Sequence, residues 1–188
     1  PMKEEVFIEM KKVKVEVLIP TFNRPSFLFN ILKSGMALNN KNIRFVVLDD
    51  GSTLSEVISG LGKLTTKQVV DHFDKISVRY IHRSINGGLS SAVYQYYQQH
   101  CLADYTIHVT DKDEFLNNTP IIAAISKLDS DPKIMMVQMP ICQWDGLKQL
   151  PLNYNYSRVS GREFIKNYVR DTRMQHAGIS GLLRANKV

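Results

Sequence analysis

The amino-acid sequence predicts an α/β fold: a mostly parallel sheet flanked by helices, in a single domain of 188 residues. Two observations support this prediction. Short apolar runs alternate along the chain with segments of helical periodicity, which is the pattern of successive βαβ units. Apolar residues make up 44% of the chain and charged residues 22%, a balance typical of a globular domain with its own core.

Five apolar runs predict the strands. The first run, 13–20, alternates apolar and polar residues and then closes on a continuous apolar end, as a strand that enters a core does. The helical segments between the runs are long enough for right-handed crossovers, so the strands are expected to be parallel. The predicted strands are 13–20, 43–50, 77–83, 105–110 and 134–140.

Five segments predict helices. In 25–38, apolar residues recur at helical spacing and Pro25 suits a first turn. Thr65 is a predicted cap for the second helix, and Ser160 with Glu163 forms a capping-box pattern for the last. The predicted helices are 25–38, 65–75, 89–100, 119–128 and 160–171.

Composition limits the partners and the location. A net charge of +6 favours anionic partners such as phosphates, nucleotides or an anionic membrane surface, with which peripheral association is expected. No aromatic and basic stripe favours nucleic acid, and no apolar run approaches the roughly 20 residues of a transmembrane helix. Two cysteines without metal-ligand spacing and a highly charged N-terminus predict a cytoplasmic protein.

Polar and acidic residues follow four of the predicted strands. Ligands of parallel sheets bind beyond the carboxyl ends of the strands, so these four loops are expected to converge on one crevice. The ordinary alternative is that strand ends meet polar loops in any protein, although "DDGS" and "DKDE" are more acidic than turns require. The four segments are 21–24, 49–52, 83–88 and 111–114.

Asp111 and Asp113 are the predicted metal ligands. They are separated by one residue in a loop, so both can present oxygens to one hard cation. Mg²⁺ and Mn²⁺ prefer oxygen ligands and take one or two carboxylates, completing their shell with phosphate and water. A bound ion would relieve the repulsion between the acids and neutralise charge on a departing phosphate. The alternative is a polar loop in which an Asp caps a turn.

Three other features suit a nucleotide. Asp50 at a strand end can accept a hydrogen bond from an N–H of a base. The glycines of the turn 86–88 precede a helix, where a phosphate or sugar can approach the backbone, and Phe22 can stack on a planar base. An ordinary glycine turn and a core position for Phe22 remain the alternatives.

Several enzyme classes lack their sequence patterns. A phosphatase of the haloacid dehalogenase type needs a second acid where this chain has Gly51. No G-x-G-x-x-G, Walker sequence or G-x-S-x-G occurs, and the histidines are scattered. A nucleotidyltransferase would have a glycine-rich loop after the first strand, where "PTFNRPSF" has none.

Four motifs together carry a family resemblance. "VEVLIPTFNRPSFLFNIL", "IRFVVLDDGS", "INGGLSSA" and "VTDKDEF" resemble, in order and rough spacing, the family 2 glycosyltransferases with the GT-A fold. The resemblance covers about residues 13–130. It implies a Rossmann-like GT-A sheet, a nucleotide-diphosphate sugar, commonly UDP-linked, as donor, Mn²⁺ or Mg²⁺ as cofactor, and transfer with inversion.

Carried over by position, the resemblance also implies roles for individual residues. Asp111 and Asp113 would hold the metal, Asp50 would contact the base, and Lys112 occupies the variable middle position of the metal motif. The implied nucleotide-binding residues are Pro20, Thr21, Phe22, Asn23, Arg24, Asp50, Asn86, Gly87, Gly88, Asp111 and Lys112.

The resemblance divides the chain into an N-terminal extension, 1–12, a nucleotide-sugar-binding domain, 13–140, and the start of an acceptor-binding part, 141–188. The acceptor would be a saccharide, a lipid-linked molecule or a protein, as in polysaccharide biosynthesis.

A carboxylate must also take the proton of the acceptor hydroxyl. In the family this acid often stands in an E-D pair, and the 75 residues after Asp113 contain none. Asp145 and Asp171 are the remaining candidates for this base. The sequence therefore predicts a C-terminally shortened enzyme or, as the alternative, a nucleotide-sugar-binding module without transfer activity.

Overall fold

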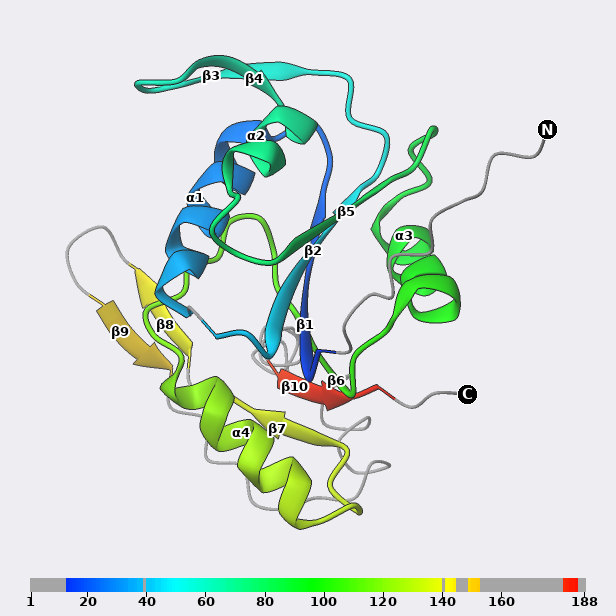
Figure 1. Cartoon of the computed structure of the whole chain (residues 1–188), viewed down its shortest axis with the longest axis vertical. Coiled ribbons are helices and arrows are strands. Elements are labelled where there is room, and N and C mark those ends of the chain that lie inside the picture. Colours follow the sequence, from blue (N-terminus) through cyan, green and yellow to red (C-terminus); the bar gives the residue numbers. More distant parts are fainter. Residues whose placement is uncertain (1–12, 39, 140, 145–148, 153–180, 186–188) are drawn as a thin grey trace.

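The sheet has six strands, and the first four of them in spatial order are parallel to one another. The computed structural model describes residues 13–38, 40–139, 141–144, 149–152 and 181–185 (Figure 1). The strands lie in the order β5-β2-β1-β6-β10-β7, and β10 pairs antiparallel with both of its neighbours. The strands of this sheet are β1 (Val15–Thr21), β2 (Ile43–Asp49), β5 (Val78–His82), β6 (Tyr105–His108), β7 (Met136–Gln138) and β10 (Gly181–Arg184).

The predicted mostly parallel α/β sheet is thus confirmed, and each predicted strand is present with ends that differ by a few residues. These strands could be predicted because β1, β2 and β6 are almost entirely buried, so each of them is an apolar run in the sequence. The structure also has two hairpins that we did not predict from the sequence. They are formed by β3 (Ser55–Ile58) with β4 (Gly62–Thr65), and by β8 (Ile141–Trp144) with β9 (Gln149–Leu152).

The helices begin where the sequence predicts them but several end earlier. Pro25 opens α1 in its first turn, and a capping box between Thr65 and Gln68 opens α2. The predicted helix 89–100 is an α-helix followed by a π-helical turn, and the predicted helix 160–171 lies outside the described residues. The helical segments are α1 (Pro25–Gly35), η1 (Met36–Leu38), α2 (Thr66–His72), α3 (Leu89–Gln95), η2 (Tyr96–His100) and α4 (Thr119–Ser130).

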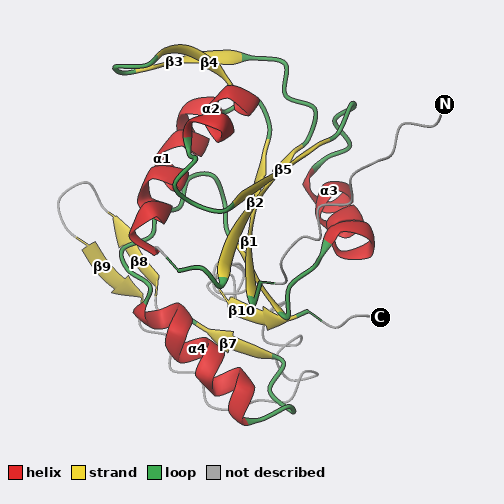
Figure 2. Ribbon diagram, viewed as in Figure 1, coloured by secondary structure: helices red, strands yellow, loops and turns green. Residues whose placement is uncertain are grey.

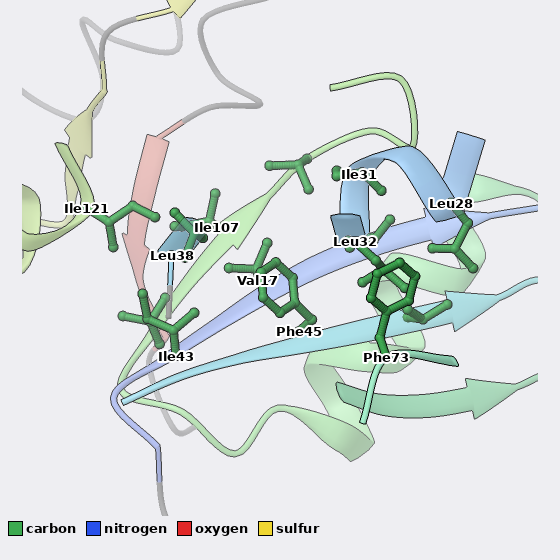
Figure 3. Packing of buried hydrophobic residues seen from close by; sticks show 14 of the residues in the cluster. Val17, Leu28, Ile31, Leu32, Leu38, Ile43, Phe45, Phe73, Ile107 and Ile121 are labelled. Atoms are coloured by element: carbon green, nitrogen blue, oxygen red, sulfur yellow. The ribbon is translucent and has the colours of Figure 1, made fainter. Parts of the chain in front are cut away.

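The helices lie on both faces of the sheet, with α1 and α2 on the side opposite to α3 (Figure 2). The larger hydrophobic cluster joins the sheet to α1, α2 and α4, and Figure 3 shows side chains of α1 gathered with side chains from β1, β2 and β6. A Cβ on Gly35 would lie 2.6 Å from the ring of Phe45, so the end of α1 approaches β2 too closely for a larger residue. The helical face and the buried strands therefore form one tightly packed core.

The face under α3 has a smaller cluster and a buried charge. Glu16 is fully buried and accepts hydrogen bonds from the Tyr96 hydroxyl at 2.8 Å and the Leu102 N–H at 3.0 Å. The guanidinium groups of Arg44 and Arg79 lie 3.7 Å and 3.4 Å from its other oxygen. These contacts compensate a buried carboxylate and anchor the end of α3 on the sheet. No helix in the described part of the chain is long and apolar enough to cross a membrane.

Candidate functional site

Loops from four neighbouring strands meet at the carboxyl edge of the sheet, and Thr21 at the end of β1 links two of them. Its carbonyl oxygen accepts the N–H of Asp50 at 3.0 Å, and its hydroxyl donates to Asp111 Oδ2 at 3.3 Å. All three residues are buried. Because β1 lies between β2 and β6, the two acids stand on opposite sides of one threonine. The predicted convergence of distant loops is therefore present in the structure.

The two acids that end β2 have different surroundings. Asp49 accepts hydrogen bonds from the Ser52 N–H at 2.8 Å and from the Tyr80 hydroxyl, and His82 Nδ1 lies 3.5 Å from it. Burial and this hydrogen bond to Asp49 raise the pKa of Tyr80, so the phenol stays protonated and donates. Asp49 is thus enclosed by β5 and its own turn, whereas Asp50 contacts the end of β1 and the loop after β5.

Asp50 is held by three donors. Arg83 Nη1 donates to its Oδ1 at 2.6 Å, the Gly87 N–H donates to the same oxygen at 3.1 Å, and the Gly88 N–H donates to Oδ2 at 2.8 Å. Arg83 also donates to the Ser91 hydroxyl at 3.0 Å. The carboxylate therefore joins the ends of β2 and β5 to the start of α3 through hydrogen bonds to a guanidinium and two backbone N–H groups.

Two glycines allow this close packing. Gly51 has φ +82°, and a Cβ there would lie 2.9 Å from the backbone nitrogen of Asn86. A Cβ on Gly87 would lie 2.5 Å from Arg83 Nη2. A side chain at either position would separate the two loops, so these glycines serve the approach of backbone to backbone and backbone to guanidinium.

The loop after β1 carries the exposed groups of the site. Phe22 is 42% exposed, so it is not a core residue, which was the alternative that the sequence left open. Arg24 Nη1 lies 3.4 Å from Asp111 Oδ1, and the guanidinium also lies over the Phe27 ring at 5.9 Å. Asn23, between Phe22 and Arg24 in the chain, donates its N–H to Ser52 Oγ at 2.8 Å and so joins the loop after β1 to the loop after β2.

The acidic loop after β6 is more open. Asp111 is buried against Thr21 and Arg24, whereas Asp113 is exposed and accepts the Thr110 N–H at 2.7 Å. Among the residues that the structure describes, Asp113 has no ion pair with a cation, and no group of three His, Cys, Asp or Glu side chains could hold a metal by itself. Burial lowers the pKa of His108, and nearby Asp113 opposes that effect. Two carboxylates without a third protein ligand fit Mg²⁺ or Mn²⁺, which keep water and phosphate oxygens.

The structure brings most of the sequence-predicted residues to one edge and adds two more. Arg83 and Ser52 hold Asp50 and Asn23, and both were visible in the sequence only as strand-end residues. Lys112 is exposed, and the Asn86 side chain accepts the Gly88 N–H at 3.0 Å. Asp145 and Asp171, the candidates for the base, lie outside the described residues.

The fold and this edge define an α/β protein in which polar and acidic loops gather beyond the carboxyl ends of parallel strands. The model of Glycosyl transferase family 2 matches residues 16–186, and the chain belongs to that family. A comparison of the sequence with curated proteins finds no significant match.

Solved GT-A glycosyltransferases share the fold. S. aureus TarS 1-349 in complex with UDP has a TM-score of 0.63 at 16% identity, covering 92% of this chain and 47% of TarS. The same protein in complex with UDP-GlcNAc gives 0.63 at 17% identity, covering 92% and 46%. Mannosyltransferase PcManGT from Pyrobaculum calidifontis, in complex with GDP-Man and Mn²⁺, gives 0.54 at 16%, covering 69% and 36%. This chain spans less than half the length of each of these chains.

Proposed function

We propose that this chain binds a nucleotide-diphosphate sugar, with UDP as the favoured nucleotide, and presents the sugar for transfer to an acceptor hydroxyl. The observation that carries the proposal is the convergence on Thr21, which puts Asp50 on one side of β1 and the acids of the β6 loop on the other. A base on one side and a diphosphate on the other match that separation. The complexes of TarS with UDP and UDP-GlcNAc support the choice of uracil.

Asp50 is the group that we assign to the base. Its Oδ2 accepts one hydrogen bond, from the Gly88 N–H, and a carboxylate oxygen has a second lone pair to offer. A carboxylate only accepts, so it pairs with a ring N–H, which uracil and guanine carry at this edge. Adenine and cytosine present a ring nitrogen that is itself an acceptor. Asp50 therefore favours UDP or GDP over ADP or CDP, and the exposed Phe22 ring offers a stacking surface.

Asp111 and Asp113 are the groups that we assign to Mn²⁺ or Mg²⁺. Asp113 is exposed and has no cationic partner among the described residues, and Asp111 contacts Arg24 only at 3.4 Å. Such an ion would supply positive charge to the departing diphosphate. The exposed Lys112 adds a second positive charge beside the two acids, which favours the anionic nucleotide.

The turn 86–88 has an indirect role in this proposal. The N–H groups of Gly87 and Gly88 both donate to Asp50. The turn therefore holds in place the carboxylate that we assign to the base. Pro20 and Thr21 end β1 beneath the same loop, where Thr21 fixes the separation between Asp50 and Asp111.

We extend the proposal to the reaction. In an inverting displacement the acceptor oxygen forms a bond to the anomeric carbon on the face opposite to the diphosphate. The bond from that carbon to the phosphate oxygen breaks, and the acceptor proton passes to a carboxylate base. A saccharide, a lipid-linked molecule or a protein fits the acceptor role, in polysaccharide biosynthesis on the cytoplasmic side of a membrane.

Calorimetry with four nucleotides tests the proposed binding. UDP, GDP, CDP and ADP would each be titrated into the chain with and without Mn²⁺. We expect UDP and GDP to bind more tightly than CDP and ADP, and Mn²⁺ to strengthen UDP. Absence of binding by all four in Mn²⁺ would contradict the proposal. Binding of UDP-GlcNAc with no transfer of the sugar, and no release of UDP, in the presence of any of the three acceptor classes would instead favour the binding module.

A further inference from the structure

One residue, Asn23, fastens the loop after β1 to the loop after β2. Its Oδ1 accepts the N–H groups of Thr53 at 2.8 Å and Leu54 at 3.0 Å, and its own N–H donates to Ser52 Oγ at 2.8 Å. These bonds join segments that are 29 to 31 positions apart in the chain. Among the hydrogen bonds of the described residues, these three are the ones that join residues 22–24 to the loop after β2.

The backbone of Asn23 is also unusual. Its φ of 55° makes it the one non-glycine residue with a positive φ in the part of the chain that the structure describes. Asn adopts this left-handed conformation more readily than most residues because its short polar side chain can bond to nearby backbone. The hydrogen bonds to Ser52, Thr53 and Leu54 hold the conformation in place, so side chain and backbone serve the same turn.

The two residues on either side of Asn23 carry exposed groups of the candidate site. Phe22 presents its ring to solvent, and Arg24 extends to Asp111 with its side chain 47% exposed. The amide oxygen of Asn23 already accepts two hydrogen bonds, which occupy both of its lone pairs. Both acceptor sites of the Asn23 amide oxygen are therefore used within the protein, while Phe22 and Arg24 on either side are exposed.

We infer that Asn23 is a positioning residue, which acts on the bound nucleotide by orienting Phe22 and Arg24 and does not contact the nucleotide itself. The family resemblance placed Asn23 among the nucleotide contacts, and its hydrogen bonds assign it this different role. The inference deepens the proposed function and rests on it.

The first turn of α1 has its own attachment. The N–H and the hydroxyl of Ser26 donate to Glu56 Oε2 at 2.8 Å and 2.6 Å, which fixes the start of α1 to β3. Loss of the Asn23 bonds should therefore loosen residues 22–24 and leave α1 in place. Variants at Asn23 are expected to fold, and their effect should fall on the ligand.

Three substitutions separate the side chain from the backbone. Asn23→Gly keeps the left-handed backbone and removes the acceptor, Asn23→Ala removes both advantages, and Asn23→Asp keeps both. We expect Asn23→Ala to weaken UDP binding about tenfold, Asn23→Gly to weaken it less, and Asn23→Asp to restore it to within about threefold of the unchanged chain. Calorimetry with UDP and with UMP measures these affinities.

The ratio of UDP affinity with Mn²⁺ to that without Mn²⁺ provides a second readout. It should change less than the UDP affinity itself, because Asn23 touches neither Asp111 nor Asp113 and reaches the metal loop only through Arg24; general damage to the site would abolish the strengthening by Mn²⁺. Asn40 offers a matched control. Its Oδ1 accepts the Asn42 N–H at 2.9 Å at the opposite edge of the sheet, so Asn40→Ala loses a similar bond and should leave UDP affinity unchanged.

Each outcome decides the inference. Unchanged UDP affinity in folded Asn23→Ala would overturn it and leave the proposed function intact. Asn23→Asp also adds a negative charge, so the deciding comparison uses uridine, which is uncharged: equal weakening of uridine binding by Asn23→Asp and Asn23→Ala would overturn the inference too, because the amide group itself would then contact the ligand. If the unchanged chain binds no UDP, the proposed function fails and the inference fails with it. Should Asn23→Ala not fold, Ser52→Ala removes one of the same hydrogen bonds, and unchanged UDP affinity in that variant would count against the inference.

Discussion

The two sides of the candidate site differ in how completely their carboxylates are partnered. On the β2 and β5 side, Asp50 is buried and receives Arg83 and two backbone N–H groups. On the β6 side, Asp113 is exposed and receives one backbone N–H, from Thr110. Both acids follow parallel strands of the same sheet, so position alone does not explain the difference.

The comparison teaches that one side of the candidate site is fixed by hydrogen bonds within the protein, whereas the other keeps an exposed carboxylate that we propose a divalent ion contacts. A carboxylate with a guanidinium and two N–H donors is oriented before any nucleotide arrives, which reduces the entropy lost on binding. On the other side Asp111 contacts Arg24 at 3.4 Å, whereas Asp113 has no ion pair among the described residues, so a divalent ion would supply the positive charge that Asp113 lacks. The predictions below test whether the two sides behave in these different ways.

The largest effect is expected from Arg83→Ala. It removes the cation that compensates buried Asp50, so we expect the free energy of unfolding to fall by about 3 kcal/mol and UDP binding to be lost. Urea denaturation and calorimetry measure the two effects.

The exposed pair of Lys67 and Asp71 on α2 is the matched control for Arg83→Ala, because Lys67→Ala breaks an ion pair at helical i,i+4 spacing. That change should cost less than about 0.5 kcal/mol and should not alter UDP binding. If Arg83→Ala lowered the free energy of unfolding and UDP affinity as little as Lys67→Ala, Arg83 would not be what holds Asp50 in place, and the contrast between the two sides would fail.

A smaller effect is expected from Phe22→Ala. Loss of base stacking should weaken UDP binding by about 1–3 kcal/mol, or roughly 5- to 150-fold in affinity. Stability should change little because the ring is 42% exposed. Tyr94 is an exposed aromatic residue on α3, so Tyr94→Ala serves as the control. Equal UDP affinity in the two variants, measured by calorimetry, would remove Phe22 from the site.

The parallel part of the fold could be predicted because its signals are local. The apolar runs of β1, β2, β5 and β6 alternate with helical segments, and the loops after them therefore had to share one edge. The order of β10 between β6 and β7 could not be predicted, since pairing of Leu182 with Ile107 and Val137 joins segments far apart in the chain. Local periodicity does not report such pairing.

That the strand-end acids share one edge could be predicted from the sequence, but their contacts could not. Asp50, Asp111 and Asp113 stand out as acids at strand ends. The partner of Asp50 is Arg83, 33 residues away, and no spacing rule connects them. The role of Asn23 depends on a positive φ at a non-glycine residue, which tertiary hydrogen bonds hold in place. Both features arise only when separate loops are packed together.

The central claim is that Asp113 is left open for a divalent ion that also binds the diphosphate. The direct test is the UDP affinity of Asp113→Asn with and without Mn²⁺. Asn keeps an oxygen for the Thr110 N–H and removes the charge, so folding stability should be preserved. Glu114→Gln neutralises the neighbouring exposed acid and is the control.

We predict that calorimetry will show Mn²⁺ strengthening UDP in the unchanged chain and in Glu114→Gln, but not in Asp113→Asn. UDP affinity without Mn²⁺ should be the same in all three, because Asp50 and Phe22 are unaltered. Equal strengthening by Mn²⁺ in Asp113→Asn and in the unchanged chain would contradict the account.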